Sequence, residues 1–424
     1  MFFVARRRAT TSLLSGRPQC YPKVSSPSMN SQPPSRSPGL FGRPVLTVTI
    51  ILAVLAGIGV GGVAVANRGS DPAALWQEPA AAATSGKSVP GTTAAAKPGA
   101  AEQAITVSAT GDIMMSNAPS RMPPGDGEGF FDSVAADLKS DLVMGNLEQP
   151  LTDDTGASKC GTPPEPNCYA FRSPPSYSRH LKAAGFQLMN LANNHTKDFG
   201  AKGAVNTRAA LDDAGIKYTG NKDEITVVEV KGIKVAVVGF SGYSGANNLN
   251  DLDHSREVIQ AAEQQADLVI VQVHMGAEGA AMQHVKPGSE IFHGENRGDP
   301  IAFSHAVIDA GADLVVGHSP HVLRGMEFYK GKLIAYSLGN FAGGGKTLSN
   351  QGVLKYGGIL RVTLGKDGSY AAGEFRSTYM NSVGLPTRDK ANEMGRQLVS
   401  RLSGEDFGDT AARIGKDGSI SPRA

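Results

Sequence analysis

The sequence predicts a layered α/β domain that follows an N-terminal transmembrane helix and a flexible linker. Three observations support this prediction: a 22-residue stretch without charge, a following segment rich in Ala, Pro, Gly, Ser and Thr, and then short apolar runs that alternate with helical patterns. Apolar runs separated by helical patterns are typical of a sheet whose faces are covered by helices.

Residues 1–44 form a basic flank with seven Lys and Arg residues and no Asp or Glu. The whole chain has a formal charge of +2, so the remaining 34 basic and 39 acidic residues give everything after the flank a charge of −5. A nucleic-acid-binding protein carries its basic residues on the folded domain, which is acidic here. The charge distribution therefore excludes nucleic acid as an expected partner and favours an oriented membrane protein.

Residues 45–66 contain no charged side chain, and about 20 apolar residues suffice to cross a bilayer. Because a basic flank stays in the cytoplasm, we expect a single-pass membrane protein with a cytoplasmic N-terminus and an extracellular C-terminal domain. The alternative is a signal peptide, since Ala64-Val65-Ala66 matches a small-x-small cleavage pattern and cleavage would release a secreted protein. The length of the flank and of the span favours the anchor.

Residues 67–104 are too poor in large apolar side chains to offset the entropy of ordering, so they predict a flexible linker. The rest is long enough for one large domain, which we expect over 105–384, followed by a C-terminal helix and tail over 385–424. The helix is expected at 388–402 and the final 15 or so residues as loosely ordered.

Cys160 and Cys168 bracket a Pro-rich loop in the part expected outside the cell. Disulfides persist in oxidising compartments, and a metal pair would come with closer Cys or His partners. We therefore expect a structural disulfide that closes this loop, while Cys20 in the cytoplasmic flank stays reduced.

Within the domain, strands and helices alternate along the chain. Strands are predicted at 105–109, 142–144, 187–191, 234–240, 268–273, 314–316, 333–337 and 359–364. Helices are predicted at 131–139, 176–184, 204–214, 254–265 and 301–310.

Polar residues that can bind metal or transfer protons follow most of these strands. The fragments are Gly111-Asp112, Gly145-Asn146-Leu147-Glu148, Asn193 to Asp198, His274 to Glu278, Gly317 to His321 and Tyr336 to Phe341. Open α/β sheets place their sites at the carboxyl ends of strands, so we expect these side chains to meet. They include four of the nine histidines, which suits a borderline divalent metal.

The fragments GDIMMSN, DLVMGNLEQPLT, NLANNHTKDFG, VQVHMGAEG and GADLVVGHSPHVLRGMEFYKGKLIAYSLGNF resemble, in this order, the CapA family of poly-γ-glutamate capsule synthesis proteins. That family is similar in fold to the calcineurin-like metallophosphatases, so the resemblance implies a layered, metallophosphatase-like domain. Its members are typically membrane-anchored bacterial proteins with an extracytoplasmic domain, which agrees with the topology expected from charge.

The resemblance also implies a metal site and a catalytic residue. The implied metal ligands are Asp112, Glu148, Asn194, His274, His318 and His321. His195 is implied as the residue that protonates a leaving group or stabilises the transition state. The metallophosphatase motifs include Asp-x-His and Gly-His-x-His, and this sequence departs from both. Met114 stands where the first motif has its His, and Ser319-Pro320 adds one residue before His321. The site is therefore expected to hold one or two ions.

A mixed set of nitrogen and oxygen ligands suits Mn, Zn or Fe. Such an ion lowers the pKa of a bound water, so the site would permit hydrolysis at a phosphoryl or acyl centre. Asp198 and Glu278 are candidate partners that orient the ligand histidines, with loop capping as the alternative for Asp198. Asn340 is a candidate site residue with a turn role as its alternative.

Three functions are compatible with the sequence. The first is a CapA-like role in synthesis, export or anchoring of an anionic cell-surface polymer such as poly-γ-glutamate, with membrane partners in a capsule synthesis complex. The second is a metal-dependent phosphoesterase or amide hydrolase that acts on cell-envelope material, and the third is a non-catalytic scaffold. The isolated basic residues Lys286, Arg297 and Arg324 are expected to be solvated, so an anionic polymer would be held mainly through bound metal.

Overall fold

The structure is a computed structural model that describes residues 103–423, all of which belong to one compact unit. The predicted cytoplasmic flank, the predicted transmembrane helix and nearly all of the predicted linker lie outside the described residues. Within 103–423, no helix combines the length and the apolar character needed to cross a bilayer.

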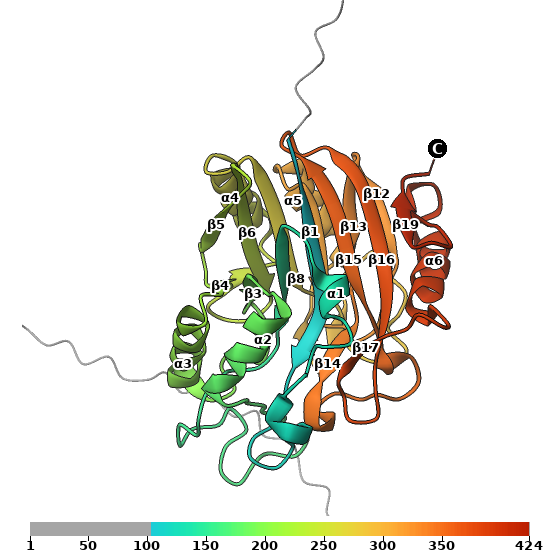
Figure 1. Cartoon of the computed structure of the whole chain (residues 1–424). Helices are drawn as coiled ribbons and strands as arrows, with labels where there is room; N and C mark the ends of the chain where they lie inside the picture. The colour runs from blue at the N-terminus through green and yellow to red at the C-terminus, as the bar shows by residue number, and fades with distance from the viewer. Residues whose placement is uncertain (1–102, 424) are drawn as a thin grey trace, which may run out of the picture. The chain divides into compact units, whose positions relative to one another are not determined.

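Two large β-sheets form the centre of the domain (Figure 1). The first has the spatial order β18 (Arg413–Ile414), β19 (Ser419–Ser421), β16 (Tyr370–Met380), β15 (Tyr356–Gly365), β1 (Ala104–Met114), β2 (Leu142–Leu147), β3 (Leu188–Asn190), β4 (Lys217–Thr219), with β14 (Asn340–Gly343) beside β1 and β17 (Pro386–Arg388) beside β16. The second has the order β12 (Met326–Tyr329), β13 (Lys332–Ala335), β11 (Leu314–His318), β8 (Leu268–His274), β6 (Ile233–Ser241), β5 (Ile225–Val230), with β7 (Asn247–Asn248) beside β6. A separate hairpin consists of β9 (Ile291–Phe292) and β10 (Glu295–Asn296).

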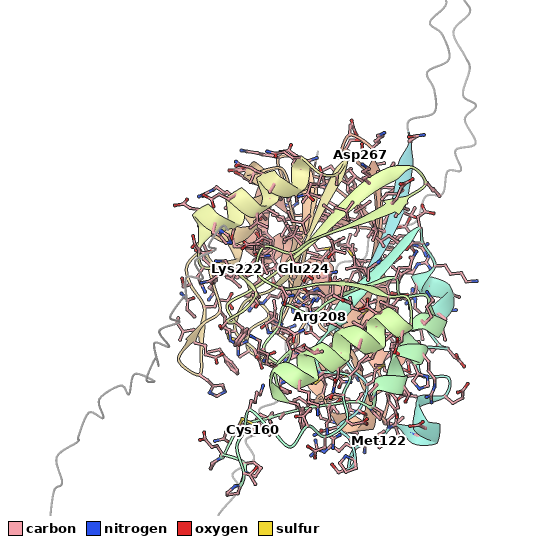
Figure 2. All side chains as sticks on the ribbon, turned by 90° about the vertical axis from the view of Figure 1, so that its left-hand side faces the viewer. Met122, Cys160, Arg208, Lys222, Glu224 and Asp267 are labelled. Atoms are coloured by element: carbon pink, nitrogen blue, oxygen red, sulfur yellow. A yellow bond between two sulfur atoms is a disulfide. The ribbon has the colours of Figure 1, made fainter. Side chains whose placement is uncertain are left out.

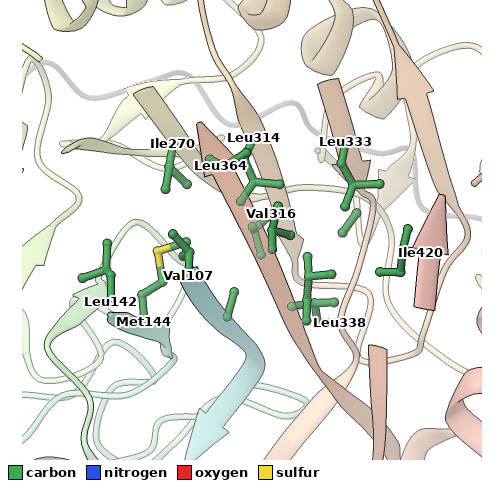
Figure 3. Packing of buried hydrophobic residues seen from close by; sticks show 14 of the residues in the cluster. Val107, Leu142, Met144, Ile270, Leu314, Val316, Leu333, Leu338, Leu364 and Ile420 are labelled. Atoms are coloured by element: carbon green, nitrogen blue, oxygen red, sulfur yellow. The ribbon is translucent and has the colours of Figure 1, made fainter. Parts of the chain in front are cut away.

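The main hydrophobic core lies between the two sheets (Figure 3). Val107 and Leu364 of the first sheet pack in one buried cluster with Ile270, Val316 and Leu333 of the second. Because both sheets contribute Val, Ile and Leu to this layer, their inner faces exclude water along most of their length.

Helices cover the outer faces of both sheets. They are α1 (Ala135–Leu138), α2 (Ser178–Ala184) and α3 (Gly200–Asp213) on the first sheet, α4 (Leu252–Glu263) and α5 (Pro300–Asp309) on the second, and α6 (Met394–Phe407) near the C-terminus. Leu181 of α2 and Leu211 of α3 share a buried cluster with Phe186. Ile259 of α4 and Phe303 of α5 share another with the second sheet. The domain is thus a four-layered mixed α/β fold.

The layered α/β prediction is confirmed, and each predicted strand and helix before residue 365 overlaps an observed one. The 11-residue strand β16 was not predicted, because its Ala, Gly, Glu, Arg and Ser residues leave one face polar and give no continuous apolar run. It pairs along its length with β15.

The C-terminal expectations need correction. The last helix begins at Met394 and not at 388, where the chain still forms β17. The end of the described chain is ordered, because β19 pairs with β16 and both Ile414 and Ile420 are buried in the central core. These two isolated apolar residues offered no periodic signal in the sequence.

The loop with Cys160 lies at the opposite end of the domain from Asp267, which precedes β8 (Figure 2). Strands β6 and β11 run parallel to β8, so the carboxyl ends of all three point away from the Asp267 end. The candidate site lies at these carboxyl ends.

Candidate metal centre

Strand register brings the fragments of the two sheets to one place. In the first sheet, Asp112 of β1 pairs with Asn146 of β2 on one side and with Asn340 of β14 on the other. In the second sheet, His318 of β11 pairs with His274 of β8. The site thus draws on both sheets at the point where their strands end.

Glycines that precede two of these residues allow the close approach. A Cβ on Gly111 would lie 1.9 Å from the carbonyl oxygen of Gly339, and one on Gly317 would lie 2.2 Å from that of Tyr336. No other residue fits at either position without moving the neighbouring backbone. The Gly-Asp and Gly-His pairs in the sequence therefore have a packing reason.

Asp112, Glu148 and His321 form a buried cluster that could hold a metal ion, with one ligand atom from each within 4.8 Å of the others. His318 Nδ1 lies 3.6 Å from Asp112 Oδ1, and His274 Nδ1 lies 4.0 Å from Glu148 Oε1. Five of the six residues implied as ligands therefore meet at one point.

Several polar atoms in this cluster are buried without a hydrogen-bond partner. They are Asp112 Oδ2, Glu148 Oε1, His318 Nδ1 and both ring nitrogens of His274. Leaving one buried polar atom unpaired costs about 1–3 kcal/mol. Five unpaired atoms at one point therefore indicate that the cluster binds a partner. Their carboxylate and imidazole chemistry fits a divalent cation.

Hydrogen bonds orient two of the histidines toward the cluster. His318 Nε2 donates to Gln272 Oε1 at 3.1 Å, which leaves the lone pair of Nδ1 facing Asp112. His321 Nδ1 donates to Asn340 Oδ1 at 2.9 Å, and the amide of Asn340 is itself fixed by donating to the carbonyl of Leu354. Partners of this kind fix the tautomer that a metal ligand needs. Asn340 thus contacts a candidate ligand, and Gln272 is a residue that sequence reasoning missed.

Burial and the close approach of the side chains shift the pKa values of the cluster. Burial, together with the negative charge of Asp112, raises the pKa of Glu148 well above its usual range. Burial lowers the pKa of His318 to about 4. Burial alone would lower the pKa of His321, but the charge of Glu148 and the carboxylate of Asp112, whose Oδ2 lies 3.2 Å from His321 Nδ1, raise it to about 10. The same histidine holds the pKa of Asp112 below its usual range, against the effect of burial.

A network of asparagines supports the two carboxylates. Asn146 Nδ2 donates to Asp112 Oδ1 at 2.8 Å and to Glu148 Oε2 at 3.5 Å. Its Oδ1 accepts from Asn190 at 3.0 Å and from Asn193 at 3.1 Å. All of these side chains are buried. Asn146 and Asn193 belong to the strand-end fragments but were not predicted as site residues, because their role depends on the pairing of β2 with β3.

The added residue between His318 and His321 is accommodated by left-handed backbone. Ser319 has φ 99° and His321 has φ 57°, a region that few residues other than glycine adopt. Such conformations cluster at functional sites, where the surrounding structure holds them in place.

His195 and Asn194 lie in the wall of a cavity of about 740 Å³ that is also lined by His321 and Glu278. His195 Nδ1 donates to Asp198 Oδ2 at 2.8 Å, so Nε2 is the ring nitrogen without a proton. The pKa of His195 is lowered by burial, although the charge of Asp198 opposes the shift. Asn194 Oδ1 is buried without a hydrogen-bond partner.

Asp198 has both of the roles considered for it. Its carboxylate accepts from His195 and from the backbone N–H of Phe171, and its own N–H donates to the carbonyl of His195. It therefore orients a histidine and closes the turn that carries it, but that histidine is His195 and not one of the clustered ligand candidates.

Glu278 lies between His321 and Arg297. Its Oε2 is 3.7 Å from His321 Nε2, and its Oε1 accepts from Arg297 at 2.9 Å. The expectation that Arg297 and Arg324 are solvated is wrong, because both are buried and paired with glutamates. Lys286 is exposed, as expected.

Met114 is buried in a small apolar cluster with Phe171, Leu348 and Met380. Its side chain also borders the cavity. Position 114, where the resemblance implies a ligand histidine, is thus part of an apolar wall.

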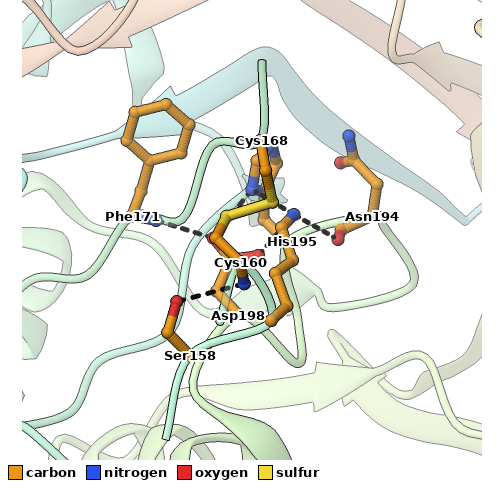
Figure 4. The surroundings of a disulfide bond; sticks show 8 residues. Ser158, Cys160, Cys168, Phe171, Asn194, His195 and Asp198 are labelled. Carbon is orange, nitrogen blue, oxygen red and sulfur yellow. Dashed lines mark hydrogen bonds and ion pairs between the residues drawn. A yellow bond between two sulfur atoms is a disulfide. The ribbon is translucent and has the colours of Figure 1, made fainter. Parts of the chain in front are cut away.

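Cys160 and Cys168 are joined by a disulfide (Figure 4). The loop that it closes lies against the segment of Asn194, His195 and Asp198. Cys168 lines the cavity, so the disulfide borders the candidate site.

The two layered sheets, with a buried carboxylate and histidine cluster at their strand ends, define a mixed α/β domain with a candidate metal centre. The chain belongs to the bacterial capsule synthesis protein PGA_cap family, whose model matches residues 106–344.

Two curated relatives carry the CapA name. The chain is 33% identical over 263 residues to the capsule biosynthesis protein CapA of Bacillus anthracis, which covers 56% of this chain and 59% of that protein. It is 30% identical over 259 residues to the PGA biosynthesis protein CapA of Bacillus subtilis, which covers 57% of this chain and 63% of that protein. The match therefore spans about three fifths of the length of these relatives.

Solved structures with a similar arrangement share little sequence. One, described as a 5′-nucleotidase from Staphylococcus aureus, is 13% identical with a TM-score of 0.38, and covers 72% of this chain and 59% of that chain. Another, a purple acid phosphatase from yellow lupin seeds, is 10% identical with a TM-score of 0.34, and covers 67% of this chain and 53% of that chain. These values assign no activity to this chain.

Proposed function

We propose that this protein acts in the synthesis, export or anchoring of an anionic capsular polymer such as poly-γ-glutamate, through a metal-dependent hydrolase-like site. The observation that carries the hydrolase part is the set of unpaired, buried ligand atoms beside a cavity that His195 also lines. The capsule part is supported by family membership and by the two CapA relatives.

Asp112, Glu148, His274, His318 and His321 would hold the ion, with Asn194 as a further candidate. A bound divalent cation of the Mn, Zn or Fe type supplies Lewis acidity and lowers the pKa of water. One ion is the simpler expectation, because Met114 packs in the apolar wall and offers no nitrogen ligand.

His195 is the candidate for proton transfer. Its Nδ1 is committed to Asp198, so Nε2 is the nitrogen that can exchange a proton with a substrate in the cavity. A positioned histidine of this kind contributes about 100- to 10,000-fold to a rate.

The cavity would offer an anionic substrate few free cationic side chains. Its two long cationic side chains, Lys159 and Arg297, are both paired with carboxylates, Asp198 for the first and Glu278 and Glu295 for the second. A polymer carboxylate in this cavity would therefore depend on the bound cation for much of its attraction.

Hydrolysis by the purified full chain tests this proposal. The metal-supplied wild type is expected to cleave poly-γ-glutamate, while His195→Ala keeps its metal and loses about 100-fold or more of kcat. Cleavage of an aryl phosphodiester alone would favour the phosphoesterase alternative. No cleavage of either substrate by a metal-loaded wild type would contradict catalysis and leave the scaffold.

The proposed location is the cell membrane, with residues 45–66 as the single anchor, residues 1–44 in the cytoplasm and the domain outside, close to membrane partners that make the polymer. The charge asymmetry of the sequence supports this orientation. The intact protein is expected in the membrane fraction. Protease added to intact cells is expected to digest its domain. A released domain that begins after Ala66 would instead support signal cleavage.

A further inference from the structure

The disulfide loop is flanked by two residues that contact the same side chain, the carboxylate of Asp198. The nine residues 160–168 form the loop, Lys159 lies immediately before it and Phe171 lies three residues after it. Both flanking residues contact Asp198, the residue that orients His195. Figure 4 shows Phe171 and Asp198 beside the disulfide.

Lys159 contacts Asp198 through both its main chain and its side chain. Its backbone N–H donates to the carbonyl of Asp198 at 2.8 Å, and its Nζ lies 2.6 Å from Asp198 Oδ1. The same ammonium donates to the carbonyl of Asn194 at 3.2 Å and lies 3.2 Å from His195 Nδ1. Lys159 therefore contacts Asn194, His195 and Asp198 in the turn that carries His195.

Phe171 contacts Asp198 from the other side. Its backbone N–H donates to Asp198 Oδ2 at 2.7 Å, the oxygen that also accepts from His195. Its ring packs edge-on against the imidazole of His195, with ring centroids 5.0 Å apart. Asp198 is thus fully buried between the two flanks of the loop.

The loop has little else to keep its two ends together. Residues 161–167 are exposed, and the backbone bonds of Glu165, to the carbonyl of Cys160 and from the N–H of Cys168, lie within the loop itself. The disulfide sets Cys160 and Cys168 with their Cα atoms 5.4 Å apart. Without this link, the exposed loop would gain conformational freedom, chiefly on the side of Lys159, because Phe171 also packs with Met114, Leu348 and Met380.

We propose that the Cys160–Cys168 disulfide is a clamp that holds Lys159 and Phe171 on Asp198 and so positions His195 in the cavity wall. Lys159 is a positioning residue in this clamp, acting through Asp198. The geometric claim stands on its own, and only its effect on turnover rests on the proposed function.

Hydrogen–deuterium exchange on the full chain tests the clamp without any assay of turnover. Dithiothreitol supplies two electrons and two protons that open the disulfide to two thiols, while the reagent closes to its own cyclic disulfide. We expect reduction to speed exchange about tenfold or more in a peptide that spans 191–200, because Asp198 loses its fixed partners. A peptide over β8, residues 268–274, is expected to keep its exchange rate.

Two results would overturn the clamp. One is unchanged exchange over 191–200 when thiol titration shows both cysteines free. The other is an equal rise over 191–200 and 268–274, which would mean that the disulfide holds the whole domain. Cys160→Ser with Cys168→Ser, measured without reductant, is expected to reproduce the local rise.

Substitutions separate the part played by Lys159. Lys159→Met is expected to raise exchange over 191–200, and Lys159→Arg to restore most of the protection, because a guanidinium can also pair with Asp198. Lys197→Met is the matched control, since Lys197 adjoins Asp198 in sequence but donates to the carbonyl of Ser244. Equal exchange in the Lys159→Met and Lys197→Met variants would refute the role of Lys159.

Turnover gives a separate readout. If the oxidised protein hydrolyses a substrate, Lys159→Met is expected to lower kcat about tenfold with KM nearly unchanged, because it misplaces His195 and not the substrate. If the oxidised protein hydrolyses nothing but exchange responds as described, the proposed activity fails and the clamp stands.

Discussion

His318 Nδ1 lies 3.6 Å from Asp112 Oδ1, although the two residues end strands of different sheets. Neither atom could take this position through local structure alone, because 205 residues and the whole interface between the sheets separate them. The contact between a buried imidazole and a buried carboxylate is what makes the strand ends of the two sheets one candidate metal centre.

Gln272, behind His318, is expected to influence the affinity of the candidate centre for metal. Gln272→Leu removes the oxygen that accepts from His318 Nε2, so the ring loses the partner that fixes its tautomer. We expect metal affinity to fall about 10- to 100-fold, as measured by calorimetric titration. Gln265 is an exposed glutamine that follows α4. Gln265→Leu is the control and is expected to bind metal with the affinity of the wild type. Equal affinities for the two variants would contradict the proposed orientation of His318.

Introducing a histidine at 114 is expected to harm stability. Met114→His buries a polar ring among Phe171, Leu348 and Met380, which costs about 1–3 kcal/mol of unfolding free energy unless a partner is found. Met114→Leu conserves volume and is expected to cost less than about 1.5 kcal/mol. Urea denaturation of the two variants checks the difference. A second bound ion in Met114→His, with no loss of stability, would contradict this expectation and show that a histidine at 114 can serve as a ligand.

Arg324 is a buried structural cation. It is fully buried and donates from both terminal nitrogens to Glu290, at 2.9 and 2.8 Å. Arg324→Ala leaves the Glu290 carboxylate without its cationic partner and with only the N–H of Ala277, and is expected to cost about 3–5 kcal/mol. Arg401→Ala, which breaks an exposed pair on α6, is expected to cost about 0.5 kcal/mol or less in the same denaturation experiment. A small loss in Arg324→Ala would mean that Glu290 finds another partner or water.

Glu327 predicts a pH dependence of stability. Burial raises its pKa, but hydrogen bonds from His305, Tyr336 and Thr410 outweigh burial and bring it below its ordinary value of 4.5. A lowered pKa in the folded state stabilises the fold above the unfolded pKa, and this stabilisation is lost as pH falls through the folded pKa. Glu327→Gln is therefore expected to be less stable than the wild type by about 1–3 kcal/mol at pH 7.

The difference between the Glu327→Gln variant and the wild type is expected to shrink in thermal unfolding as the pH falls below 4.5. Glu405→Gln, in the exposed Glu of the α6 pair, serves as the control with a small and constant difference. A difference for Glu327→Gln that stays the same from pH 7 into this acidic range would contradict the hydrogen-bonded carboxylate.

The sequence predicts the site residues better than the contacts among them. Gly111-Asp112 and Gly317-His318 could be read as strand-end pairs, and strand ends are where α/β sheets gather polar residues. Gln272 could not, because it lies inside the apolar strand β8 and acts only through the register of β8 with β11. Asn146 belongs to a strand-end fragment, but its contacts depend on the pairing of β2 with β1 and β3. Strand β16 escaped prediction for a related reason, since its stability comes from pairing with β15 more than from its own side chains.

The roles of Arg297 and of the disulfide were also beyond the sequence. Arg297 lies in a stretch without periodic apolar residues, yet Glu278 and Glu295 enclose it in the folded domain. The sequence places Cys160 and Cys168 at the ends of a loop, but only the fold brings that loop against His195 and Asp198. Contacts between distant segments depend on how the layers pack, which residue patterns within one segment do not record.

Metal content of the purified full chain tests the central claim most directly. After incubation with Mn²⁺, Zn²⁺ or Fe²⁺ and removal of excess ion, elemental analysis is expected to find at least one equivalent of metal in the wild type and in a His254→Ala control. His318→Ala and Asp112→Asn are expected to lose most of it. A wild type that holds none of the three ions when each is supplied would contradict the metal centre.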